Sequence, residues 1–302
     1  MAHAEYTPPE SAVIKQRQNE AGALRLLIAQ RRLYTRAKAW QGIRWVGLLV
    51  LGLAAPFVAL LVPSAAVVIG AITGAWLFAG RTLLTVLEAR TMVKAACVQE
   101  ELDQMLFAMP RTITRSERPE PEEVALLSGR DDRLHQIAAK ENLLDWYPID
   151  PADAGAVSVA IAQRSNASYT GRLIRTTVII WAAVAVLWTV ILIVWASVTD
   201  ITLSDFLLGA LFPVLPAVLD VSEYLVSTWK AARDRSDLAA TIALRLSPDQ
   251  PAIDGQELLV WQERLFDLRR TTPQIPDWLY RITRRRNERA MHAAAATLRG
   301  NG

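Results

Sequence analysis

The chain has 302 residues, of which 52% are hydrophobic and 21% charged, and its formal net charge is +3 at neutral pH. One cysteine, Cys97, excludes an internal disulfide, and the scattered His3, His135 and His292 exclude a Cys/His metal cluster. We predict no metal, no cofactor and no nucleic-acid partner. Because this composition also fits one large buried core, the distribution of charge along the chain decides the class of protein.

Two long stretches contain no charged residue. They are the 36 residues between Arg44 and Arg81 and the 24 residues between Arg175 and Asp200. A hydrocarbon layer of about 30 Å needs roughly 20 apolar residues in a helix. The second stretch therefore predicts one transmembrane helix and the first nearly two, so the chain is predicted to be an integral membrane protein.

The first 44 residues are polar and basic, which makes them too long and too polar for a cleaved signal peptide. Apolar residues recur there at helical spacing, and no proline intervenes between residue 14 and the membrane. We expect residues 1–44 to form an N-terminal cytosolic helix that continues into the first span.

Residues 45–80 are predicted to form a tight transmembrane hairpin, divided at Pro63 and Ser64. In its second helix, Gly70 and Gly74 have the small-xxx-small spacing that allows two helices to approach closely. Packing inside the hairpin and oligomerisation both explain this motif.

Residues 81–175 form the predicted central cytosolic region. Residues 81–109 extend the second span as a helix up to Pro110. Residues 110–135 contain several prolines and many charges, which predicts an exposed loop. The remainder reads as helix with a break at residues 147–151.

Residues 176–229 form the predicted second transmembrane hairpin, and its first helix carries a tryptophan stripe. Trp181, Trp188 and Trp195 recur every seven residues and so share one helical face. We favour contact with lipid for this stripe. A subunit-packing seam is the alternative.

The fourth span is too short without an acidic residue. Residues 206–219 are uncharged, but as a helix these 14 residues cover only about 21 Å. The span therefore either starts near residue 201 and includes Asp205, or runs to about residue 229 and includes Asp220 and Glu223.

Asp220 and Glu223 are three positions apart and so share one helical face. Carboxylates inside a membrane normally face a bundle interior or a water-filled path. Pro213 and Pro216 would kink this helix and free backbone carbonyls, which favours a cavity-lining position. We predict these four residues as pore-lining candidates. Alternatively, the two acids only mark the end of the helix at the level of the lipid head groups.

Residues 230–302 are predicted to form C-terminal cytosolic helices: one to about residue 246, one over 256–270 and a last one to about 298, separated by proline-containing turns. Basic residues fix the orientation, because fourteen of them lie in the long segments within about 15 positions of the span ends and none lies in the two short turns. Both termini are therefore predicted to be cytoplasmic.

Catalytic motifs are missing from the sequence. It has no P-loop, GxGxxG, HExxH or GxSxG pattern, and adjacent acids such as Glu122 and Glu123 are ordinary surface charges. We predict that the protein is not an enzyme and has no catalytic residues.

Two kinds of residue are candidates for contacting a signal or an anionic ligand. Basic clusters suit phosphate as well as anionic lipid; they comprise Arg31, Arg32, Arg284, Arg285 and Arg286. Polar residues next to the third span either contact a ligand or form a hydrogen-bonded core joining the cytosolic segments; they are Gln163, Arg164 and Asn166.

Short motifs spread over most of the chain resemble those of one family. They are Ile14 with Arg17, Gln18 and Asn19; Ala29 to Arg32 with Tyr34, Ala37 and Lys38; Gln99 and Glu100 with Asp103, Leu106, Phe107 and Pro110; Asp145 to Tyr147; Gln163 and Arg164 with Asn166 and Tyr169; and Trp261, Gln262, Arg269, Pro276 to Trp278 and Tyr280. In their order and placement, the motifs resemble the SMODS-associated four-transmembrane effectors of bacterial cyclic-oligonucleotide antiphage systems. The chain departs from that pattern at Arg111, Thr112 and Ala162.

The resemblance implies an all-α integral membrane protein of the bacterial inner membrane, with four transmembrane helices in two hairpins. It also implies a pore-forming effector that oligomerises in the lipid bilayer, triggered by a nucleotide second messenger from a cognate nucleotidyltransferase. An ordinary channel or transporter subunit, or a structural membrane scaffold, is the alternative.

Overall fold

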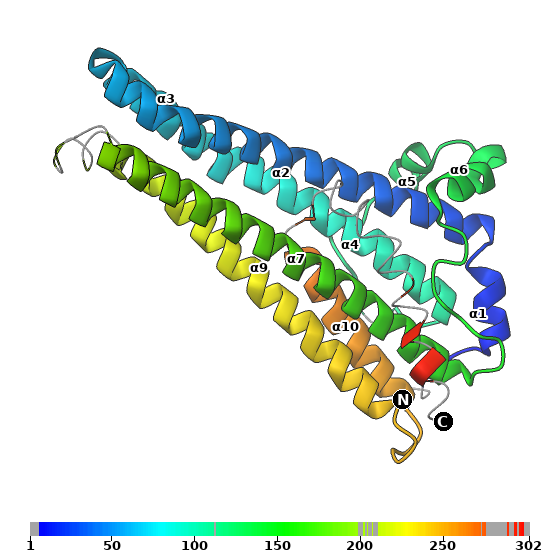
Figure 1. Cartoon of the computed structure of the whole chain (residues 1–302). Coiled ribbons are helices and arrows are strands. Elements are labelled where there is room, and N and C mark those ends of the chain that lie inside the picture. The colour runs from blue at the N-terminus through cyan, green and yellow to red at the C-terminus, as the bar shows by residue number, and fades with distance from the viewer. Residues whose placement is uncertain are drawn as a thin grey trace.

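The computed structural model describes residues 6–111, 113–198, 202, 204, 207, 211–272, 274–275, 289, 293–294 and 296–298. All regular structure within these residues is helical (Figure 1). In chain order the elements are α1 (Ser11–Arg17), α2 (Ala21–Leu61), η1 (Pro63–Ala65), α3 (Ala66–Ala79), η2 (Gly80–Leu84), α4 (Thr85–Phe107), α5 (Pro121–Ser128), η3 (Asp131–Arg133), α6 (Leu134–Glu141), α7 (Gly155–Val198), α9 (Phe212–Arg245) and α10 (Gly255–Thr271).

Long unbroken helices dominate the fold. The 41-residue α2 is about 60 Å long and runs through the predicted end of the first cytosolic segment. The one helix predicted over residues 1–44 is interrupted, however, because α1 ends at Arg17 and α2 begins at Ala21. In contrast, α3, η2 and α4 follow one another without a break. The π-helical turn η2 lies between them, and the Thr85 hydroxyl donates to the carbonyl of Gly80 at 2.8 Å.

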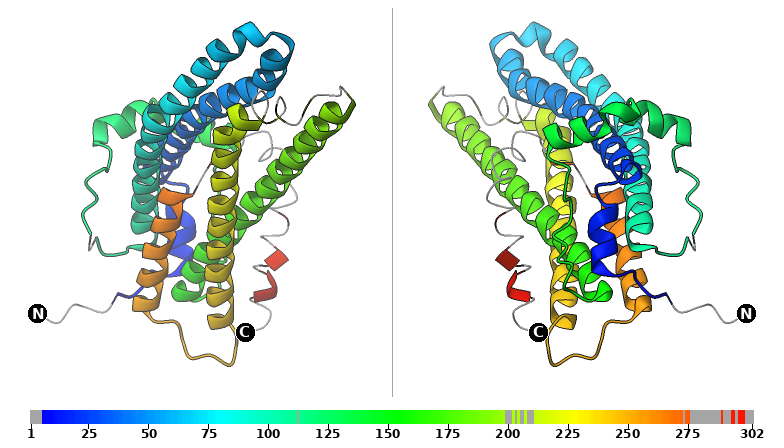
Figure 2. Two further views of the ribbon diagram at one scale, coloured as in Figure 1. Left: turned by 90° about the vertical axis from the view of Figure 1, so that its left-hand side faces the viewer. Right: turned by 90° about the vertical axis from the view of Figure 1, so that its right-hand side faces the viewer.

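The long helices form two pairs, and the helices within each pair lie side by side (Figures 1 and 2). The first helix pair is α2 with α3, η2 and α4, and the second helix pair is α7 with α9. Among the described residues, two helices are long and apolar enough to cross a membrane, Ala66–Phe107 and Gly155–Val198. The layout with four spans in two hairpins stays a prediction.

Residues 110–135 are not one exposed loop, so that part of the prediction was wrong. They contain α5 and the short turn η3, and Val124 of α5 is buried against the rest of the molecule. Pro121 occupies the first turn of α5, where proline is well tolerated because its missing N–H would have no helical partner. Proline therefore starts a helix here and does not mark a loop.

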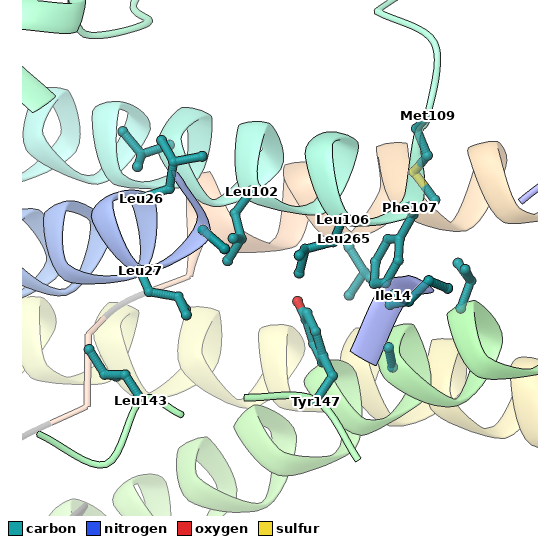
Figure 3. Packing of buried hydrophobic residues seen from close by; sticks show 14 of the residues in the cluster. Ile14, Leu26, Leu27, Leu102, Leu106, Phe107, Met109, Leu143, Tyr147 and Leu265 are labelled. Atoms are coloured by element: carbon teal, nitrogen blue, oxygen red, sulfur yellow. The ribbon is translucent and has the colours of Figure 1, made fainter. Parts of the chain in front are cut away.

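One end of the molecule is a compact bundle, made of residues 6–44, 85–175 and 230–272. Its hydrophobic core joins α1, α2, α4, α7, α9 and α10 through fully buried side chains such as Leu27, Leu106 and Leu265 (Figure 3). The rings of Phe107 and Tyr147 lie 5.6 Å apart in this core. Burial of this apolar surface holds the separate segments together.

The other end is an apolar half, made of residues 45–84 and the described part of 176–229. Large apolar side chains point outward there, with exposed fractions of 82% for Val67, 72% for Phe78 and 75% for Val198. In water such a continuous apolar surface would be costly, whereas in a bilayer it faces lipid. The surface of the apolar half is therefore suited to a membrane.

The tryptophan stripe of α7 packs against α2 of the same chain. Trp181 stacks on Trp45 with ring centroids 5.5 Å apart, while Phe57 contacts Trp188 at 5.7 Å and Trp195 at 4.9 Å. The favoured interpretation, contact with lipid, was therefore wrong for this face. Aromatic contacts join the two helix pairs in the apolar half.

Close approach of α2 and α3 does not use the predicted glycine motif. A Cβ atom on Gly47 would come within 1.9 Å of the Trp76 ring, whereas Cβ atoms on Gly70 or Gly74 would meet no described atom within 4 Å. Gly47 is thus the glycine that lets Trp76 of α3 lie against α2. The Gly70 and Gly74 face is open in the single chain.

Candidate functional site

A charged bridge links the two helix pairs at the border between the apolar half and the compact bundle. Arg81 in η2 donates from Nε to Asp220 Oδ1 at 2.6 Å and from Nη2 to Glu223 Oε2 at 3.0 Å. Both carboxylates belong to α9, one helical turn apart, so one guanidinium spans both. Two predicted pore-lining acids are thereby brought together and paired with one residue from the other helix pair, whose single positive charge offsets one of the two negative charges.

Beside this bridge lies a cavity of about 430 Å³. Its lining comes from α2, η2, α4 and α9, and from Arg270, Thr271 and Thr272 at the end of α10. The bridge residues Arg81, Asp220 and Glu223 form part of its lining. The cavity therefore touches both helix pairs and the compact bundle.

A second ion pair lines the same cavity. Arg44 of α2 donates from Nη1 to the Thr85 hydroxyl at 2.7 Å and lies 3.5 Å from Glu88. Burial raises the pKa of the Glu88 carboxyl, and the charge of Arg44 partly opposes this rise. The cavity lining therefore contains charges of both signs.

The two predicted pore-lining prolines lie at the start of α9. Pro213 is in the first turn, where a missing N–H does not break the helical hydrogen-bond pattern, so the kink expected there is not needed. Pro216 lies one turn further along the same continuous helix. The side chains of both residues are outside the described part of the structure, as are Asp205 and the alternative start near residue 201.

The compact bundle contains a buried polar network centred on Asp103 of α4, which is 1% exposed. Its Oδ1 accepts from the Tyr147 hydroxyl at 2.6 Å, and its Oδ2 accepts from Gln262 at 2.8 Å and from Arg269 at 2.6 Å. Burial and the neighbouring carboxylate raise the pKa of Tyr147, so its hydroxyl keeps the proton that it donates. Three distant parts of the chain meet at one carboxylate.

Other motif residues extend this network. The side chain of Gln18 accepts from the Tyr147 backbone N–H at 2.9 Å, and Asn19 exchanges two hydrogen bonds of 3.0 Å with Asp145. The Tyr34 hydroxyl donates to Gln99 at 2.9 Å. Many residues of the family motifs thus make the hydrogen bonds that link α1, α2, α4 and the segment before α7.

The ligand candidates on α7 lie in or beside this network. Gln163 is buried and donates to the Leu258 carbonyl at 3.0 Å and to Gln262 at 3.1 Å, while Asn166 hydrogen-bonds the Tyr147 side chain. Arg164 is half-buried, and burial lowers its pKa, as does the charge of Arg172. Gln163 and Asn166 therefore make hydrogen bonds that join the cytosolic segments in this state, which is one of their two predicted roles, and contact with a ligand stays a prediction.

Arg31 and Arg32 both pair with Glu141 at the end of α6, at 3.0 Å and 2.6 Å. These contacts hold α6 against α2. The other predicted basic cluster, Arg284, Arg285 and Arg286, lies outside the described residues. The role of all these residues in sensing a signal stays a prediction.

Several residues of these sites were not singled out from the sequence. In the sequence Arg81 only marks the end of the first uncharged stretch, and its partners are more than 130 positions away along the chain. Asp103 and Arg269 appeared in the motifs without an assigned role. Within the described ranges, no group of three or more His, Cys, Asp or Glu side chains is placed to hold a metal ion.

The sequence was compared with protein families, curated proteins and solved structures. A family described as the SMODS-associating 4TM effector domain matches residues 12–298, nearly the whole chain. Curated proteins and solved structures gave no match. The resemblance expected from the motifs is thereby confirmed: the chain belongs to the SMODS-associating 4TM effector family.

Proposed function

We propose that this protein is a pore-forming effector of a bacterial antiphage system, opened by a cytosolic nucleotide second messenger to permeabilise the inner membrane. Membership of a SMODS-associated family of membrane effectors supports a link to a partner nucleotidyltransferase. The protein acts as a homo-oligomer in the bilayer, with both termini and the compact bundle in the cytoplasm.

The bridge from Arg81 to Asp220 and Glu223 carries this proposal. It joins the two helix pairs where the compact bundle meets the apolar half, which is the inner mouth of any path between the pairs. The exposed fraction of the Asp220 side chain is 17%, so Arg81 covers the carboxylate that would attract cations. In this proposal the described state is the closed one, and opening breaks the bridge.

Continuous helices connect the compact bundle, where the signal would bind, to the Arg81 bridge. The helices α2, α7 and α9 each run from the compact bundle into the apolar half without a break. A ligand that favours a different packing of the compact bundle therefore moves the membrane ends of the same helices. Separation of the pairs would uncover Asp220 and would release Glu223, whose side chain is already 76% exposed, from Arg81.

The test is leakage from vesicles that contain the purified protein. Arg81→Gln removes the bridge and leaves both carboxylates in place, so we expect cation leakage without any signal, at least tenfold above the wild-type rate. Asp220→Asn combined with Glu223→Gln also removes the bridge but leaves no negative charge at the mouth, where only the positive charge of Arg81 remains. This double variant is expected to leak with a lower preference for cations over anions.

Arg90→Gln is the matched control, because Arg90 is an exposed arginine on α4 with no ion pair among the described residues. It should leak no more than the wild type. The proposal fails if Arg81→Gln stays as tight as Arg90→Gln, or if the double variant conducts with the ion preference of Arg81→Gln.

A further inference from the structure

Two arginines lie in the interior of the compact bundle, where charged residues are rare. Arg235 of α9 and Arg269 of α10 are each 3% exposed. Arg269 pairs with the Asp103 carboxylate, whereas Arg235 donates only to neutral groups, the Leu268 carbonyl at 2.9 Å and the Thr272 hydroxyl at 3.4 Å. The described residues therefore supply one buried carboxylate for two buried guanidinium groups at this position.

Much of the hydrogen-bonding capacity of both arginines is unused. Nε and Nη1 of Arg235, and Nε and Nη2 of Arg269, are buried and have no acceptor among the described residues. Buried donors without partners are rare in folded proteins, and each one calls for an explanation. A buried charge without a counter-ion is costlier still.

The two guanidinium groups lie close enough to influence each other. The pKa of Arg235 is lowered to about 10, mainly by burial; Tyr34 opposes this lowering and the positive charge of Arg269 adds to it. Both arginines also act on the Tyr34 hydroxyl of α2, whose pKa burial raises to about 12. Tyr34 of α2, Arg235 of α9 and Arg269 of α10 thus form one cluster, and its two guanidinium groups make it positively charged.

We propose that this cluster binds a phosphate group of the activating ligand, held by the unpartnered N–H groups of Arg235 and Arg269. The inference rests on the proposed function, because it locates the anionic part of the second messenger. Guanidinium groups match phosphate oxygens with paired hydrogen bonds, and one phosphodiester charge balances the excess positive charge.

The cavity between the helix pairs gives the ligand a way in. Thr272, which accepts a hydrogen bond from Arg235, also lines the 430 Å³ cavity. The side chain of Thr272 therefore lies between the proposed phosphate site and the cavity. The rest of the ligand occupies the cavity itself, beside Arg81, Asp220 and Glu223.

This placement connects binding to opening. Arg235 lies 15 positions after Asp220 on the same helix, about 22 Å along its axis. The end of α10 lines the cavity together with the bridge. A phosphate that draws α9 and α10 together at Arg235 and Arg269 therefore moves α9 relative to Arg81.

The test measures the unfolding temperature of the full chain in detergent, with inorganic phosphate as the probe and chloride at equal ionic strength as the reference. Wild-type protein should show a saturable rise of about 5 °C at a hundredfold excess over the dissociation constant. Arg235→Met should raise the unfolding temperature without phosphate, since it removes an unpaired buried charge, and should abolish the phosphate-dependent rise.

Arg235→Lys keeps the positive charge but cannot make the paired hydrogen bonds of a guanidinium group. Its phosphate-dependent rise in unfolding temperature should therefore be less than half that of the wild type. Arg233→Met, an exposed arginine on the same helix, should behave like the wild type. The inference is overturned if phosphate does not stabilise the wild type, if Arg235→Met keeps the full phosphate shift, or if Arg235→Met lowers the unfolding temperature of the ligand-free protein. The unfolding measurement is made in detergent and does not depend on pore formation. If phosphate stabilises the protein but the vesicles do not leak, the proposed pore is refuted and the phosphate site is still supported.

Discussion

In the compact bundle, Leu27 and Leu106 are fully buried, whereas in the apolar half Leu187 is 61% exposed and Val67 is 82% exposed. The same helices carry both kinds of residue, since α2 runs through the two regions. Water forces apolar side chains inward in the first region, and lipid tolerates them outward in the second. The compact bundle thus has the buried apolar core and the polar networks of a protein in water, whereas the apolar half has the outward-facing apolar surface of a protein in lipid.

The largest expected effect is on the centre of the compact bundle. Asp103→Asn leaves the Arg269 guanidinium, 3% exposed, without its acidic partner. Breaking one side of a buried ion pair costs about 3–5 kcal/mol of unfolding free energy. Urea unfolding in mild detergent, followed by circular dichroism, measures this loss.

Asp267→Asn is the control for this change, because its partner Arg270 is exposed and three positions away on the same helix. That pair should contribute no more than about 0.5 kcal/mol. Equal losses for Asp103→Asn and Asp267→Asn would mean that the Asp103 network does not hold the compact bundle together.

Leucine truncation tests the two regions directly. Leu27→Ala creates a cavity in the buried core and should cost about 2–5 kcal/mol. Leu187→Ala removes the same atoms from an outward-facing position of the apolar half and should change the unfolding free energy by less than about 0.5 kcal/mol. If the Leu187 variant loses as much as the Leu27 variant, this face of α7 is covered by protein and not by lipid.

A glycine pair tests packing within the apolar half. Gly47→Ala would place a methyl group 1.9 Å from the Trp76 ring, so the helices must shift at a cost of about 1–3 kcal/mol. Gly74→Ala meets no described atom within 4 Å and should be neutral or slightly stabilising in the single chain. Thermal unfolding of both variants in one detergent compares them. A larger loss at Gly74 would show that its face is used for contact between copies.

The smallest expected effect is the pH dependence of an ion pair at the water-facing edge. The hydrogen bond from Arg245 lowers the pKa of Glu257 below its ordinary value of 4.5. The ionised carboxylate therefore stabilises the fold above about pH 4.5, and this contribution disappears as the pH falls through the lowered value. Glu257→Gln should be less stable than the wild type at pH 7, with the difference shrinking towards pH 3. A difference that grows in acid would contradict the assignment.

Local patterns predicted the long helices well, because the helical spacing of apolar residues is a property of neighbouring positions. Proline was a poorer guide, since Pro56 lies inside α2 and Pro216 inside α9. The same patterns did not reveal partners. The tryptophan stripe defined a face of α7 but not that Trp45 and Phe57 cover it. Arg81 and its carboxylates are separated by about 140 positions, so no local signal joins them.

The central claim is that the Arg81 bridge keeps the two helix pairs closed. Arg81→Cys and Glu223→Cys, with Cys97→Ala to remove the native thiol, allow a short bismaleimide to replace the bridge by a covalent link. We expect the uncross-linked double-cysteine variant to leak ions from vesicles without a signal and the cross-linked protein to be as tight as wild type. Equal leakage before and after cross-linking would contradict the claim.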